Sequence, residues 1–133
     1  MAANLEARIR ERVAADPSVS LALVFGSLAS GRARPESDLD LAVAGPQPLT
    51  AGQKILLIAD LALLSGRPVD LVDLRTAGSV LLDEVLRHGR FLYLEDRNLY
   101  AELIKRRVFD HADWLPYRDR ILAERRRRWI NAS

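Results

Sequence analysis

Two aspartates inside one short apolar run, Asp38-Leu39-Asp40-Leu41, constrain this chain more than any other feature. Residues two apart on a strand point to the same side of a sheet, with backbones about 6.5–7 Å apart. Aspartate is depleted in strands, and two like charges on one face repel each other. A divalent cation would offset that repulsion, whereas a solvent-facing pair on an edge strand would leave it uncompensated. The pattern therefore predicts a metal site on a strand.

A third carboxylate, Asp70, lies in the apolar run from Val69 to Leu74, which we expect to form another strand. If the two strands are neighbours, Asp70 completes a site with Asp38 and Asp40 for two Mg²⁺ ions, which prefer hard oxygen ligands. Asp70 would then ligate the ion that activates an acceptor hydroxyl, or help to remove the proton of that hydroxyl. Asp73 points to the opposite face, and we expect it to be structural.

A Gly-Ser pair, Gly26-Ser27, ends the apolar run Leu21 to Phe25. Glycine allows the backbone to approach a phosphate closely, and the free N–H groups of a following helix would bind its charge. We expect that helix to be short and to end at Gly31. On its own such a pair is usually a turn. Because the two aspartates follow ten residues later, the pair instead indicates a site for the β- and γ-phosphates of a nucleotide.

Strands and helices alternate along the chain, which predicts an α+β domain with a small mixed sheet. The expected strands are Leu21–Phe25, Asp38–Ala44, Val69–Leu74 and Phe91–Leu94. The first expected helix is capped by Asn4 and has Leu5, Ile9 and Val13 on its buried stripe. The second runs from a capping box of Thr50 and Gln53 to Gly66. A third covers Val80–His88, and two more lie near 97–113 and 116–130, divided by Pro116. We expect a single domain, 1–133, with a core over 1–95 and a C-terminal helical segment over 96–130.

Composition narrows the class of protein. The chain has 133 residues and no cysteine, which excludes disulfides and thiolate zinc sites. No signal peptide is evident, and the longest apolar stretch is too short to cross a bilayer, so we expect a soluble, cytoplasmic protein.

A net charge of +2 is too small to predict direct nucleic-acid binding. The run Arg125 to Arg128 fits a solvated helix face, and Trp114, Tyr117 and Trp129 fit either internal packing or a partner interface.

The Gly-Ser turn, the spacer, the Asp-x-Asp pair and the later aspartate together resemble the nucleotidyltransferase superfamily that shares the DNA polymerase β fold. The short chain and the spacer are similar to its minimal branch, the MNT-domain proteins, and in particular to MntA-like antitoxins. The resemblance covers roughly residues 20–74, and the helical tail of such antitoxins resembles residues 75–130 more loosely. It implies that Asp38, Asp40 and Asp70 are catalytic and bind metal.

The resemblance also implies a function. Such antitoxins pair with HEPN-domain RNase toxins and use ATP and Mg²⁺ to transfer AMP to a toxin tyrosine, which silences the toxin. Gly26 and Ser27 would bind the nucleotide. The branch usually has an arginine where this chain has Ser30, so Arg32, or else Arg34, would have to reach the phosphates. Two alternatives stay open: nucleotidyl transfer to a small molecule or an RNA end, and an antitoxin that acts by binding alone.

Overall fold

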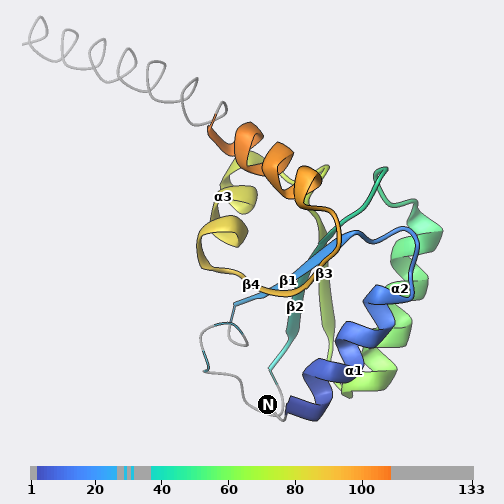
Figure 1. The fold of residues 1–133 in the computed structure, drawn as a ribbon. Helices are drawn as coiled ribbons and strands as arrows, with labels where there is room; N and C mark the ends of the chain where they lie inside the picture. Colours follow the sequence, from blue (N-terminus) through green and yellow to red (C-terminus); the bar gives the residue numbers. More distant parts are fainter. Residues whose placement is uncertain (1–2, 27–28, 30, 32–36, 109–133) are drawn as a thin grey trace, which may run out of the picture.

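The computed structural model describes residues 3–26, 29, 31 and 37–108, which form a sheet between two layers of helices (Figure 1). The elements in chain order are α1 (Ala3–Ala14), β1 (Leu21–Phe25), β2 (Leu39–Ala44), α2 (Ala51–Ser65), β3 (Val69–Asp73), α3 (Ser79–His88) and β4 (Arg90–Leu94), followed by a helix over 97–108. The strand order is β3-β2-β1-β4. Strand β1 is antiparallel to both neighbours and β2 is parallel to β3, so the sheet is mixed, as predicted.

The alternation along β2 assigns its two faces to two separate cores. Leu39, Leu41 and Val43 pack with residues of α1 and α2 on one face. Ala42 and Ala44 pack with residues of α3 and of the 97–108 helix on the other face. Figure 1 shows α1 and α2 side by side on one side of the sheet and α3 on the opposite side. Because side chains alternate along a strand, Asp40 lies on the face that α3 covers.

The helix boundaries follow local signals. Thr50 accepts a hydrogen bond from the backbone N–H of Gln53 at 3.1 Å, and the Gln53 side chain accepts one from the N–H of Thr50 at 2.9 Å. This pair is the predicted capping box of α2. Gly66 ends that helix in the left-handed conformation, with φ of 66°. The predicted stripe on α1 is also confirmed, since Ile9 and Val13 are buried and Leu5 packs against the same core.

Sequence predictions need correction at the ends of several elements: β3 ends at Asp73 and not at Leu74, α3 begins at Ser79 and not at Val80, and β4 begins at Arg90 and not at Phe91. Helix α1 is already formed at Ala3, so Asn4 lies in its first turn and is not its N-cap. An exposed polar residue is tolerated there because the first-turn N–H groups have no partner within the helix. The second strand begins at Leu39 and not at Asp38, because the parallel pairing starts with Leu39 opposite Val69.

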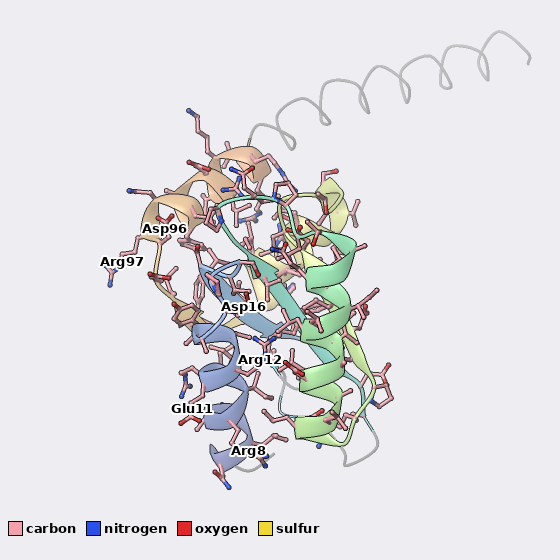
Figure 2. The ribbon with its side chains drawn as sticks, turned by 90° about the vertical axis from the view of Figure 1, so that its right-hand side faces the viewer. Arg8, Glu11, Arg12, Asp16, Asp96 and Arg97 are labelled. Atoms are coloured by element: carbon pink, nitrogen blue, oxygen red, sulfur yellow. The ribbon has the colours of Figure 1, made fainter. Side chains whose placement is uncertain are left out.

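Arg12 links α1 to α2 on the outer side of the core that these two helices form with the sheet (Figure 2). Its Nε donates to Asp60 of α2 at 2.7 Å, and its Nη1 donates to Asp16 at 3.1 Å. Both carboxylates keep part of their surface in water, where an ion pair stabilises a fold by about 0–1 kcal/mol. The pair with Asp60 therefore links the two helices and adds little to stability, whereas the pair with Asp16 is local to the end of α1.

Within the described residues, none of the helices is both long and apolar enough to cross a bilayer. Several predictions lie outside these residues: the helix expected between Gly26 and Gly31, the end of the helix expected over 97–113, the helix over 116–130, and the roles of Trp114, Tyr117, Trp129 and the Arg125 to Arg128 run.

Candidate active site

Asp40 and Asp70 are direct neighbours in the sheet. In the parallel register of β2 and β3, Asp40 lies opposite Asp70, and on its other side it lies opposite Phe25, the last residue of β1. Asp38 precedes β2 by one residue and is exposed, as is Asp70, while Asp40 is partly buried. The predicted condition for a three-carboxylate site, that the two strands are neighbours, is therefore met.

The charges of these carboxylates act on one another. The pKa of Asp40 is raised above its ordinary value of 3.8, first by burial and then by the negative charges of Asp70 and Asp38. A carboxylate that ionises against two like charges is stabilised when a cation binds beside it. The electrostatics of Asp40 therefore favour a bound cation.

Gly26 brings the backbone of the first turn against Asp40. It follows β1 and has φ of 67°, a left-handed conformation that glycine adopts without strain. A Cβ at this position would lie 2.2 Å from Oδ2 of Asp40. A side chain there would displace the carboxylate of Asp40, so the missing Cβ leaves room for it.

The three aspartates form an open group. Among the residues that the structure describes, no three Asp, Glu or His side chains are gathered closely enough to enclose a metal ion. Mg²⁺ does not need such a cage, because it is usually held by one or two carboxylates and completed by water and substrate phosphates. The oxygen donors, the neighbouring placement of Asp40 and Asp70, and the space beside Gly26 fit Mg²⁺ brought in with a nucleotide.

Other predicted site residues lie outside the described residues. These are Ser27 and Arg32, together with Ser30 and Arg34, so their expected contacts with phosphates stay predictions.

Asp73 has the structural role expected of it. Only 5% of its surface is exposed. It accepts hydrogen bonds from the backbone N–H of Leu49 at 2.8 Å and from that of Arg75 at 3.0 Å. The carboxylate thus fixes the loop before α2 to the end of β3.

One residue near the site has no signal in the sequence. Arg67 lies in the turn between α2 and β3, and its Nη1 donates to the carbonyl of Ser37 at 3.1 Å. Thirty positions separate the two residues. Only the parallel pairing of β2 with β3 brings them together, so no local pattern could have identified the contact.

Comparisons with known proteins bear on the family and on the fold of this chain. The family model for polymerase beta nucleotidyltransferases matches residues 7–98. Among curated proteins, the protein adenylyltransferase MntA of Shewanella oneidensis is 36% identical over 87 residues. That stretch covers 64% of this chain and 63% of the length of MntA.

Solved structures match over most of the chain. A toxin–antitoxin structure with AMP-PNP has a TM-score of 0.72 at 26% identity, and the match covers 91% of this chain and 95% of that one. A tri-AMPylated HEPN toxin of Shewanella oneidensis in complex with its MNT antitoxin gives a TM-score of 0.67. That match covers 90% of this chain and 97% of the other, and at 22% identity it supports the fold alone.

Proposed function

Because this chain belongs to the polymerase beta nucleotidyltransferase family, we propose that it is an antitoxin that transfers AMP from ATP to a tyrosine of a HEPN-domain toxin. The similarity to MntA and to a toxin–antitoxin pair that binds AMP-PNP supports this choice of donor and partner. The observation that carries the proposal is the pairing of Asp40 with Asp70 beside Gly26. Since ATP is abundant in the cytoplasm, we expect the reaction there.

The residues divide the work of a phosphoryl transfer, which depends mainly on positioning and on neutralising charge. Asp38, Asp40 and Asp70 would hold Mg²⁺ at the edge of the sheet. Mg²⁺ bound there would neutralise the phosphates and the leaving pyrophosphate. Gly26, with Ser27 and Arg32, would bind the β- and γ-phosphates, so that the α-phosphorus lies near the carboxylates.

The transfer itself exchanges one bond for another. The tyrosine oxygen forms a bond to the α-phosphorus, and the bond from that phosphorus to the bridging oxygen breaks, which releases pyrophosphate. Asp70, which is exposed next to Asp40, would accept the hydroxyl proton. The product is a toxin that carries AMP on the oxygen of its tyrosine.

The test is the intact mass of the partner toxin after incubation with this protein, ATP and Mg²⁺. We expect the mass of one or more AMP groups to be added by the wild-type protein, and none by the Asp38→Ala/Asp40→Ala variant. The fold of this variant should persist, because Asp38 is exposed and Asp40 is only partly buried. Transfer by the double variant at the wild-type rate would refute the proposal, as would neutralised toxin that gains no mass.

A further inference from the structure

Of the three aspartates, Asp38 is held least by the sheet. Asp40 is paired on both sides, with Phe25 and with Asp70. Asp38 precedes the first paired residue of β2, and its surface is exposed. The position of its carboxylate therefore depends on how firmly its two chain neighbours, Ser37 and Leu39, are fixed.

Both neighbours are tied to the turn that precedes β3. The backbone N–H of Leu39 donates to the carbonyl of Pro68 at 2.8 Å. Nη1 of Arg67 donates to the carbonyl of Ser37 at 3.1 Å, in a partly buried contact. A hydrogen bond from a charged donor is stronger than one between neutral groups, and partial exclusion of water strengthens it further. Asp38 is thus held between two anchored residues.

We propose that Arg67 is a positioning residue for the metal site, which fixes the backbone at Ser37 so that the carboxylate of Asp38 stays beside Asp40. The inference rests on the proposed function in one respect, since it takes Asp38 as a metal ligand. Without Arg67, the backbone at Ser37 would lose this contact, while Leu39 would keep its own hydrogen bond to Pro68. Removing a group that orients a metal ligand typically lowers metal affinity by about 10–100-fold.

The same strand supplies a matched control. At the other end of β2, Nε of Arg75 donates to the carbonyl of Gly45, which is also a partly buried contact between a guanidinium and a backbone carbonyl. Gly45 is seven residues from Asp38, about 23 Å along an extended strand. Loss of the Arg75 contact should therefore loosen β2 without displacing the aspartates.

The experiment measures metal binding directly. Mn²⁺ replaces Mg²⁺ and is titrated into the protein with AMP-PNP, free Mn²⁺ is followed by electron paramagnetic resonance, and the Mn²⁺ bound in a titration of AMP-PNP alone is subtracted. We expect Arg67→Ala to raise the Mn²⁺ concentration at half-saturation by about tenfold or more, and Arg67→Lys, which keeps a charged donor, to restore most of the affinity. Arg75→Ala should leave half-saturation within about twofold of the wild type, whatever it does to the melting temperature.

A double-variant cycle shows whether Arg67 acts through Asp38. In an Asp38→Asn background, Arg67→Ala should cause no further loss of Mn²⁺ affinity, because the ligand that it positions is already gone. An equal loss in both backgrounds, or an Arg67→Ala variant that binds as Arg75→Ala does, would overturn the inference alone. A wild-type protein that binds no Mn²⁺ under these conditions would overturn the proposed function as well.

Discussion

Replacing Gly26 with alanine would change the candidate site in two ways. The backbone at Gly26 has φ of 67°, which alanine adopts at a cost of about 1–2 kcal/mol. The new Cβ would also lie 2.2 Å from Oδ2 of Asp40, 3.2 Å from its Cγ and 3.5 Å from its Cβ. An ordinary contact begins near 3.4 Å, so the carboxylate oxygen has to move by about 1 Å.

The two effects have separate magnitudes. The backbone strain should lower the free energy of unfolding by about 1–2 kcal/mol, which is about 3–8 °C in melting temperature for a chain of this size. A displacement of about 1 Å at a reacting group costs on the order of 100-fold in rate. We therefore expect modest destabilisation of Gly26→Ala together with a loss of about 100-fold in AMP transfer.

Gly66→Ala separates strain from displacement. Gly66 has φ of 66°, almost the same conformation, but a Cβ there would meet no atom within 4 Å. Thermal unfolding should show a similar loss of stability in both variants, and only Gly26→Ala should lose AMP transfer and Mn²⁺ affinity. A Gly26→Ala variant that transfers AMP at near the wild-type rate, or a Gly66→Ala variant that loses as much activity, would contradict this prediction.

Three further variants test the charges and contacts around the sheet. Asp40→Asn should stabilise the metal-free protein at pH 7 by about 0.2–1 kcal/mol, because the raised pKa of Asp40 means that its ionised form destabilises the fold. Protonation of Asp40 removes that cost from the wild-type protein, so the stability advantage of Asp40→Asn in melting curves should shrink as the pH falls toward 3.8. An advantage that grows on acidification would contradict the raised pKa of Asp40. Asp73→Ala should cost about 2–6 kcal/mol in urea unfolding, since the N–H groups of Leu49 and Arg75 lose their acceptor at about 1–3 kcal/mol each, and a loss below 1 kcal/mol would be inconsistent with this role. Thr50→Ala should cost about 1 kcal/mol through loss of the α2 cap and leave AMP transfer unchanged, so reduced transfer at saturating ATP would count against a purely local role.

Local patterns predict the elements of this fold well. The run Leu21–Phe25 is a strand with those same bounds, because its residues are apolar and both sheet faces are covered there. Thr50 and Gly66 mark the ends of α2, because each has a conformational or capping preference that few other residues share. Asn4 misled the prediction, because asparagine is only one of several residues that an exposed first turn accepts.

Contacts between distant residues are harder to predict. The sequence places Asp40 and Asp70 on strands, but whether the strands are neighbours, and in which register, depends on how α2 packs across the sheet. The ion pair between Glu6 and Arg90 joins positions 84 residues apart, and the contact between Arg67 and Ser37 follows only from the parallel pairing. Side chains of these types recur throughout an arginine-rich chain, so their pairing cannot be read from spacing.

The most direct test of the metal site is a crystal structure of the protein with Mn²⁺ and AMP-PNP, in which anomalous scattering locates the metal. We expect a peak about 2.1 Å from a carboxylate oxygen of Asp40, within reach of Asp38 or Asp70 and of the nucleotide phosphates. Nucleotide bound with no metal peak at these aspartates, or with the metal held elsewhere on the chain, would contradict it.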